Sequence, residues 1–381
     1  EEDWEQRKLG DISSLITKGT TPKDKSGTGE VNFIKVENIN DFSGDIVGMS
    51  KISLEEHQGY LKRSQLQEGD ILFSIAGTLG RVTSVNKEIL PANTNQALSI
   101  IRLKEGNLEY VKTCLKGNVV ADFIRRNPTI GAQPNLSLEQ VSNLEIEIPS
   151  EAEQEKIGLY FSNLDHLITL HQRKCEETKK LKKYMLQKMF PQNGKRVPEI
   201  RFAGFTDDWE QRKLGDVTEL KSASRVHKGE WTDSGVPFFR SSDVMAAING
   251  TTNEKAYISE ELYEKLSNAS GKLEEGDVLV TGGGSVGNPY IVPNNEPLYT
   301  KDADLLWIKN QGRFYPYFLY EYFFSPTFRI YLSNISHVGT IAHYTITQLS
   351  ETPISLPDIE EQIKVGEYFE SLDRLITLHQ R

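Results

Sequence analysis

Residues 282–287, Gly-Gly-Gly-Ser-Val-Gly, are the stretch of this chain that fits a nucleotide-binding pattern. They follow an apolar run at 277–281 and have the spacing G-x-G-x-x-G, in which bare backbone can approach a pyrophosphate. That chemistry also needs a helix directly afterwards, with its N-terminus facing the phosphates. Residues 288–295 contain two prolines and cannot form that helix. We therefore predict no nucleotide cofactor here, but a tight hairpin whose backbone can approach a phosphate or a base edge.

Other catalytic and metal-binding signatures are missing from the sequence. The phosphate loop G-x-x-x-x-G-K-[ST] is absent, so ATP hydrolysis has no visible site. Asn-Pro-Pro-aromatic and Asp-Pro-Pro-aromatic tetrapeptides, which would form the loop for amino-methylation of a base, are absent as well. His166 and His171 are five positions apart on one helical segment, which does not bring both to one metal ion. We expect a chain without enzymatic activity, cofactor or metal.

A second class of residues suits binding. Small, amide and basic side chains recur in loops at matching positions of the two halves of the chain. Ser, Thr, Lys and backbone amides contact phosphates, whereas Asn, Gln, Arg and Lys can pair with base edges. The candidate nucleic-acid contacts are Lys18, Thr20, Thr21, Lys23, Lys35, Asn38, Thr78, Arg81, Asn95, Gln96, Gln133, Asn135, Lys221, Ser224, Arg225, His227, Lys228, Arg240, Ser242, Asp243, Ser285, Asn288, Lys301 and His343. The alternative is ordinary turn chemistry, because Gly, Thr, Asn and Pro form loops for conformational reasons alone.

A duplicated scaffold must position these loops. Residues 3–11, Asp-Trp-Glu-Gln-Arg-Lys-Leu-Gly-Asp, recur unchanged at 208–216. Further matches keep an offset of about 205 to 208 positions, so the whole chain is a two-fold duplication. The copies agree at their edges and in short apolar runs, and they diverge in the loops between. This pattern indicates one scaffold that carries two different binding surfaces.

Each half is predicted to be a mixed α/β domain with a curved, barrel-like sheet. Short β-branched or apolar runs bounded by Gly, Asn and Pro predict strands. The predicted strands are 31–36, 70–74, 98–103 and 144–148, then 236–240, 277–281, 305–308 and 353–356. Apolar residues at helical spacing predict one helix at 110–126 and another at 315–334.

A long helix is predicted after the first half, and its beginning is written again at the C-terminus. Residues 164–173 and 372–381 differ at one position. Ile157, Phe161 and Leu164 begin a 4-3 spacing that gives the helix an apolar seam, and the second copy keeps this seam. We therefore expect the two helices to pair. The central helix, at about 1.5 Å per residue, would be on the order of 50 Å long, or roughly fifteen base pairs of DNA.

Composition restricts the function further. The net charge of −10 argues against a nonspecific nucleic-acid binder, although local basic surfaces remain compatible with it. No apolar run approaches the roughly 20 residues that span a bilayer. Two cysteines in different segments favour a reducing, cytoplasmic setting. Because the chain does not begin with Met and its last helix stops where its twin continues, we expect it to be trimmed at both ends.

The repeated edge and the paired helices together resemble the specificity subunit of type I restriction–modification enzymes. Residues 201–216, the loop at 20–22, and 149–173 with its repeat carry the resemblance, which covers essentially the full chain. It implies two target-recognition domains, each binding half of an asymmetric, interrupted site on double-stranded DNA. It also implies that the paired helices act as a spacer and dock two methyltransferase subunits, through which restriction and translocase subunits join.

We therefore expect an α+β fold. It is a tandem duplication of a mixed α/β target-recognition domain followed by a long helix, with the two helices pairing as an antiparallel coiled coil. The expected parts are a first recognition domain at 1–150, a spacer helix at 151–192, a linker and second recognition domain at 193–357, and a distal, truncated helix at 358–381. The alternative function is a non-catalytic protein-binding scaffold or adaptor. A scaffold predicts little salt dependence, whereas DNA reading predicts an affinity that falls steeply with salt.

Overall fold

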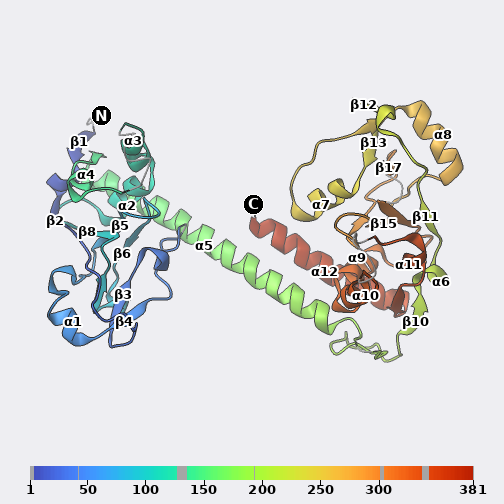
Figure 1. The fold of residues 1–381 in the computed structure, drawn as a ribbon, viewed down its shortest axis with the longest axis horizontal. Helices are drawn as coiled ribbons and strands as arrows, with labels where there is room; N and C mark the ends of the chain where they lie inside the picture. The colour runs from blue at the N-terminus through green and yellow to red at the C-terminus, as the bar shows by residue number, and fades with distance from the viewer. Residues whose placement is uncertain are drawn as a thin grey trace. The chain divides into compact units, whose positions relative to one another are not determined.

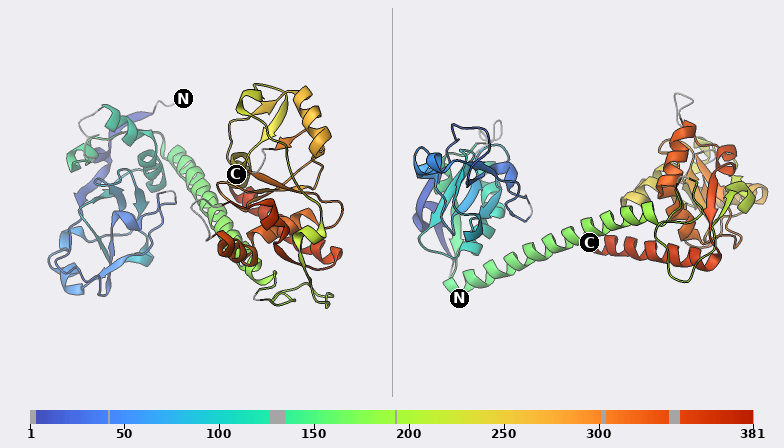
Figure 2. Two further views of the ribbon diagram at one scale, coloured as in Figure 1. Left: turned by 45° about the vertical axis from the view of Figure 1, so that its right-hand side comes forward. Right: turned by 90° about the horizontal axis from the view of Figure 1, so that it is seen from below.

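The computed structural model describes residues 4–41, 43–126, 135–192, 194–300, 304–336 and 343–380 (Figure 1). The chain divides into two compact units, Glu1–Arg173 and Lys174–Arg381, which are described separately. The long helix α5 (Glu151–Lys188) contributes its beginning to the first unit and its end to the second. Two further views show the elements of each unit from other sides (Figure 2).

The described part of the first unit contains two sheets and a two-stranded ribbon. The larger sheet is antiparallel, in the order β2 (Ser13–Lys18), β8 (Leu98–Leu103), β5 (Ile71–Ser74) and β6 (Val82–Ser84). The smaller sheet has the order β4 (Ser50–Ile52), β3 (Val31–Ile34) and β7 (Ala92–Thr94), with β3 and β7 parallel. The ribbon pairs β1 (Glu5–Lys8) with β9 (Glu145–Ile148).

The second unit repeats this topology, with one further strand in its smaller sheet. Its larger sheet has the order β11 (Leu220–Ser222), β18 (Leu305–Ile308), β15 (Val278–Thr281) and β16 (Pro289–Ile291). Its smaller sheet has the order β12 (Trp231–Thr232), β14 (Tyr257–Ile258), β13 (Val236–Phe239) and β17 (Tyr299–Thr300). The ribbon pairs β10 (Glu210–Lys213) with β19 (Pro353–Leu356). The duplication inferred from the sequence is therefore a duplication of the fold.

Alternation along the strands buries both faces of each larger sheet. In the first unit Ile71, Phe73 and Ile101 pack with Tyr110 and Val111 of the helical layer. Their neighbours on the strands, Leu72, Leu98 and Ile100, pack on the opposite face with Ile34 and Ala92 of the smaller sheet. Successive side chains of a strand point to opposite faces, so a run of apolar residues serves two cores. The second unit has the same division between its two cores.

Two expectations about these elements need correction. The single curved sheet expected for each half is divided into two sheets. After β7 the chain turns, with the Leu98 amide bonding the Asn95 carbonyl at 3.2 Å, and β8 then joins the other sheet. The predicted helix at 110–126 is two helices, α2 (Leu108–Lys116) and α3 (Asn118–Arg126), separated by Gly117. Gly117 donates to two carbonyls of the last turn of α2 and so ends that helix.

The predicted helix at 315–334 is likewise two helices, α9 (Pro316–Phe324) and α10 (Pro326–Ser336). Ser325 between them is extended, with φ −65° and ψ 150°, because the ring of a following proline disfavours the helical conformation. Short helices that the sequence did not predict also occur. They are α1 (Leu54–Gln58), α4 (Leu138–Ser142), α6 (Leu214–Val217), α7 (Ser241–Asn249), α8 (Glu260–Ser270) and α11 (Ile346–Ser350).

Within the second unit, the end of α5 pairs with α12 (Ile359–Gln380) in antiparallel orientation. Cys175 lies against the Ile376 carbonyl, Lys182 binds Asp373 and Phe190 stacks on Phe369, so contacts advance along one helix and recede along the other. Met189 and Phe190 are buried in the core of this unit. The antiparallel pairing predicted from the sequence is confirmed. No helix among the described ranges is long and apolar enough to cross a membrane.

Candidate nucleic-acid interface

The glycine-rich stretch forms the hairpin between β15 and β16, and one hydroxyl closes it. Thr281 Oγ1 donates to the Ser285 carbonyl and accepts from the Asn288 amide at 2.9 Å. The first unit uses the same arrangement in its β5–β6 hairpin, where Ser74 Oγ donates to the Thr78 carbonyl at 2.6 Å. The hairpins therefore present Thr78 and Ser285 at equivalent, exposed positions.

Backbone hydrogen bonds hold each hairpin beside two other loops. In the first unit the Ile75 amide bonds the Ala97 carbonyl at 2.9 Å, and the Leu136 amide bonds the Ile75 carbonyl at 2.8 Å. In the second unit Gly282 occupies the place of Ile75: its amide bonds the Asp304 carbonyl at 2.8 Å, and its carbonyl accepts from the Tyr344 amide at 2.8 Å. The same framework thus gathers the hairpin, the turn before β8 or β18 and the segment before α4 or α11. The candidate contacts on these pieces are Thr78, Asn95, Gln96 and Asn135 in the first unit and Ser285, Asn288 and His343 in the second.

The loop after β2 lies against the turn that carries Gln96. The Thr20 amide bonds the Thr94 carbonyl at 2.9 Å, and Thr21 Oγ1 donates to Gln96 Oε1 at 2.9 Å. Gly19 allows this approach, because a Cβ at that position would lie 2.1 Å from the Asn95 carbonyl oxygen. Lys18, Thr21 and Lys23 are exposed on this loop, and the Lys23 ammonium lies 4.7 Å from the centre of the Tyr60 ring.

Three candidate side chains lie at the loop that follows β3, and each has a partner within the protein. Asn38 is buried and donates to the Val47 and Gly48 carbonyls at 3.1 and 2.8 Å, while its Oδ1 accepts from the Lys35 amide. Arg81 donates to the Val36 and Ile39 carbonyls, both at 3.0 Å, and pairs with Asp41. Asn38 and Arg81 therefore hold the loop that follows β3. Lys35 is half-buried and pairs with the exposed Glu37 at 3.7 Å.

In the second unit, a charged pair holds the equivalent loop, which follows β13. Asp243 accepts from the Arg240 amide at 2.8 Å, as Asn38 does from Lys35, and also pairs with Arg240 Nε at 3.1 Å. The Arg240 guanidinium lies 5.6 Å from the centre of the Trp231 ring and bonds the Glu254 carbonyl. Ser242, on the first turn of α7, is exposed beside this pair. Arg240 and Asp243 are thus occupied in shaping the loop.

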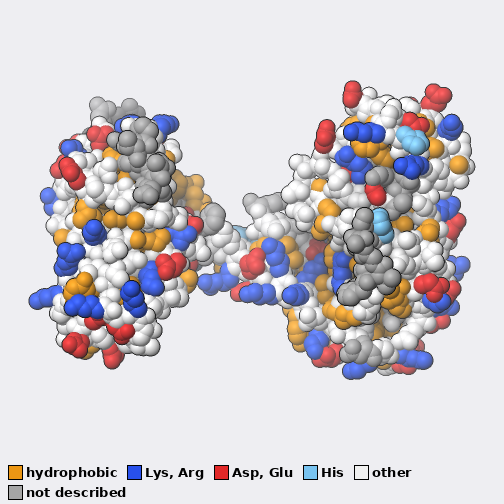
Figure 3. Space-filling view, viewed as in Figure 1, with side chains coloured by type: hydrophobic (Ala, Val, Ile, Leu, Met, Phe, Trp, Pro, Cys, Tyr) orange, Lys and Arg blue, Asp and Glu red, His pale blue; other side chains and the backbone are white. Residues whose placement is uncertain are grey.

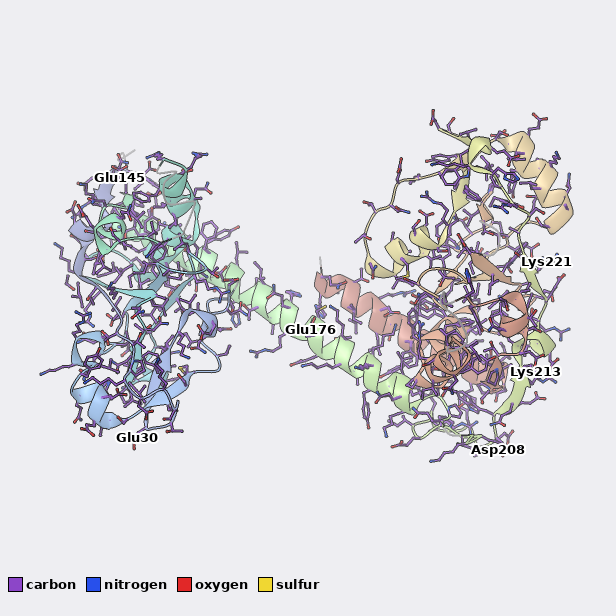
Figure 4. The ribbon with its side chains drawn as sticks, viewed as in Figure 1. Glu30, Glu145, Glu176, Asp208, Lys213 and Lys221 are labelled. Carbon is purple, nitrogen blue, oxygen red and sulfur yellow. The ribbon has the colours of Figure 1, made fainter. Side chains whose placement is uncertain are left out.

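The loop after β11 carries several exposed basic residues. Arg225, His227 and Lys228 are exposed, and the neighbouring Ser224 carbonyl accepts from the Tyr299 hydroxyl at 3.1 Å. Lys221 on β11 (Figure 4) is directed instead to the Ser270 carbonyl at 3.3 Å and over the Trp307 ring. Lys and Arg side chains lie among uncharged and hydrophobic ones on the face of each unit drawn in Figure 3.

Gln133 and Lys301 lie outside the described residues. Two basic residues that the sequence reasoning missed lie beside candidate contacts. Arg63 Nε donates to Thr20 Oγ1 at 3.3 Å, and Arg329 Nη2 donates to Asn288 Oδ1 at 3.1 Å. Burial lowers the pKa of Arg329. Arg63 could have been suspected from its position next to Lys62 in a polar segment, whereas nothing local distinguishes Arg329 within its helix.

A metal site is not visible in the parts of the chain that the structure describes, where no three His, Cys, Asp or Glu side chains converge as ligands would. What converges is a set of hydroxyl, amide and basic groups on loops supported by rigid sheets. Such groups bind phosphates and base edges.

Comparisons with known proteins agree with this chemistry. Residues 1–180 and 206–381 each match the model of the type I restriction modification DNA specificity domain. A putative type I restriction enzyme MjaX specificity subunit of Methanocaldococcus jannaschii is 25% identical, with 100% of this chain and 89% of the relative aligned. The MjaVIII specificity subunit of the same organism is 24% identical, over 100% and 88%.

A solved structure has a similar fold. The crystal structure of a type I restriction–modification S subunit from M. genitalium superposes with a TM-score of 0.61, at 14% identity, over 99% of this chain and 91% of that one. The two matched segments together cover most of the chain, and they coincide with the two copies of the repeat. The chain therefore belongs to the family of type I restriction–modification DNA specificity subunits, which recognise DNA and carry no catalytic centre of their own.

Proposed function

We propose that each unit of this chain reads one half of an asymmetric, interrupted site on double-stranded DNA, with the matched loop surfaces described above. The first surface consists of the β2–β3 loop, the β5–β6 hairpin and the turn at 95–97. The second consists of the β11–β12 loop, the β15–β16 hairpin and the segment that starts at His343. Two unlike half-sites follow from the proposal, because the loops differ while their framework is shared.

The observation that carries this proposal is the repeated hydrogen bonding around Ile75 and Gly282. A framework that is the same in both units fixes where the loops stand. The side chains on those loops differ, from Gln96 and Asn135 in one unit to Arg225 and His343 in the other. Base-edge recognition depends on side-chain identity, and phosphate contacts depend on placement. A frame that the two units share, with loops that differ between them, supplies both requirements.

We further propose that the helices α5 and α12 dock two methyltransferase subunits, and that restriction and translocase subunits join through these. Exposed apolar side chains on both helices support this role, among them Leu181 and Tyr184 on α5 and Leu375 and Leu378 on α12. Exposed apolar groups gathered on one element mark interaction surfaces. A complex that acts on the cell's DNA would operate in the cytoplasm.

The test is a selection from a random duplex library by this chain assembled with its methyltransferase subunits. We expect two short, unlike motifs at one fixed separation. Exchanging residues 208–357 for the corresponding part of a relative should change one motif and leave the other. A flat sequence profile from a folded complex would rule out the recognition of two half-sites. A salt titration adds a second check, because phosphate neutralisation makes log affinity fall linearly with log salt.

A further inference from the structure

A buried ionic cluster joins the end of α5 to two other helices of the second unit. The Lys182 ammonium of α5 lies 2.8 Å from Glu321 Oε1 on α9 and 2.7 Å from both carboxylate oxygens of Asp373 on α12. Tyr317, one turn before Glu321, donates its hydroxyl to Asp373 Oδ2 at 3.0 Å. The Glu321 side chain is completely buried and that of Lys182 is 15% exposed. This is a closed cluster with no visible role in DNA contact.

The corresponding positions of the first unit do not form this cluster. The helix α2 of the first unit corresponds to α9, and the position of Glu321 is there occupied by Thr113, whose hydroxyl bonds the Glu109 carbonyl of its own helix. Asp165 corresponds to Asp373, but it pairs with Lys116 at the surface. A buried charge that the same fold omits elsewhere is weak evidence for stability, and such groups can instead select one arrangement of packed elements.

The position of Lys182 along α5 suggests that the cluster selects one orientation of this helix on the second unit. Met189 and Phe190 bury the end of the helix in the core, whereas Glu176, Glu177, Lys179, Lys180 and Lys183 are exposed. Met185 and Leu186 pack beside this core, and Cys175 lies against the Ile376 carbonyl of α12. Packed helices held by such uncharged contacts can slide by small amounts. Lys182 adds a charged attachment between them, roughly 12 Å before Phe190 at about 1.5 Å per residue.

Because α5 is long, a small shift at Lys182 moves the beginning of the helix by a larger distance. The beginning of α5 at Glu151 is roughly 58 Å from Phe190 along the helix, about five times the distance to Lys182. A displacement of about 1 Å at Lys182 would thus move the start of the helix by about 5 Å. That exceeds the roughly 3.4 Å that separates neighbouring base pairs.

We propose that Lys182, Glu321 and Asp373 fix the angle at which α5 leaves the second unit, and that this angle sets the number of base pairs between the two half-sites. The inference rests on the proposed function, in which each unit reads one half-site. Lys182, Glu321 and Asp373 are positioning residues and do not contact DNA. They determine the separation that is accepted, while the loops determine the bases that are read.

Lys182→Met tests the proposal in the chain assembled with its methyltransferase subunits. It keeps the aliphatic stem and removes the ammonium. We expect the library selection to return the same two motifs, with separations spread over neighbouring lengths or moved by one base pair or more. In direct binding, the unaltered complex should lose about tenfold or more when the separation changes by one base pair, and the variant should lose about threefold or less.

Two further variants distinguish positioning from general stability. Lys272→Met removes another lysine–carboxylate pair of the same unit, the exposed contact with Glu264, and should leave both motifs and their separation unchanged. Glu321→Gln retains the oxygen that receives Lys182 and should keep the single separation, whereas Glu321→Leu should widen it. Thermal unfolding of each variant shows whether the second unit remains folded.

The outcomes separate this inference from the function on which it rests. If the unaltered complex returns no pair of motifs, the recognition of two half-sites fails. If it returns a pair and folded Lys182→Met keeps the same single separation, the role of the cluster is refuted. If Lys182→Met unfolds the second unit, Asp373→Asn, which removes a charge and little volume, decides by the same criterion.

Discussion

Arg201 donates two hydrogen bonds to the carboxylate of Glu361, from Nε to Oε1 at 2.7 Å and from Nη2 to Oε2 at 2.8 Å. The indole of Trp209 donates to the same Oε2 at 3.0 Å, and Glu361 is fully buried. Trp209 belongs to the nine-residue repeat, and its twin Trp4 is 43% exposed. One repeated sequence therefore has two environments, because a segment after α5 covers it in the second unit.

The first prediction concerns this buried fork. Glu361→Ala should lower the free energy of unfolding of the second unit by about 3 kcal/mol, because it leaves the Arg201 guanidinium and the Trp209 indole without their acceptor in a site closed to water. Denaturant unfolding followed by tryptophan fluorescence measures the change.

Glu153→Ala is the matched control. Glu153 is exposed at the corresponding position of the first unit, so its removal should change stability by no more than about 0.5 kcal/mol. Equal losses from the two substitutions would show that the fork adds nothing beyond the helix in which Glu361 lies.

The strands could be predicted from the sequence because their signals are local. Every predicted strand exists, since apolar runs such as 71–74 must be buried on both faces wherever they occur. The breaks at Gly117 and Pro326 were missed although the residues were in view, because apolar periodicity continued across both of them. Periodicity reports which face is buried, and the backbone chemistry of glycine and proline decides whether the helix is continuous.

The partners of individual polar side chains could not be predicted from local signals. Asn38 was named for its ability to pair with a base edge, and in the structure its amide group bonds three backbone groups of its own loop. Lys182 stands in a lysine-rich stretch at 179–183 that gives no sign of a buried partner, and its two partners are more than a hundred residues away along the chain. A side chain's chemical capacity is local information, whereas its partner is set by the fold. The base contacts themselves remain predictions.

The second prediction is a pH dependence at Glu321. Burial, opposed by the Lys182 ammonium and reinforced by Asp373, raises the pKa of Glu321 to about 8 in the folded protein, against 4.5 for the free side chain. Between these values the folded state holds a proton that the unfolded chain has lost, so the contribution of Glu321 to stability falls as pH rises through this window.

Glu321→Gln cannot titrate and removes this dependence. The stability of the variant relative to the parent should therefore increase between pH 5 and pH 8, by on the order of 1 to 3 kcal/mol. Denaturant unfolding at several pH values measures the difference, and Glu367→Gln on the exposed side of α12 controls for the loss of a carboxylate. A constant difference across the range would contradict the raised pKa.

The third prediction tests the close approach at Gly19. Gly19→Ala places a methyl group within about 2 Å of the Asn95 carbonyl in the unrelaxed structure, so the β2–β3 loop or the turn must shift. We expect a loss of about 1 to 3 kcal/mol from the first unit. The first motif in the library selection should also weaken while the second persists. Gly229→Ala, where no atom lies within 4 Å of the added Cβ, should be tolerated.

The fourth prediction separates phosphate contacts from base contacts in the second unit. Arg225 is exposed on the loop after β11. If Arg225 contacts a phosphate, Arg225→Met should weaken binding about equally for all sequences and reduce the slope of log affinity against log salt by about one. If it reads a base, the selected motif should instead relax at one position, with a cost of about 1 to 3 kcal/mol for the preferred base. Competition binding with the selected duplex and with single-position variants, at several salt concentrations, distinguishes these results. An unchanged affinity, salt slope and motif would remove Arg225 from the interface, and would direct the search to His227 and Lys228 on the same loop.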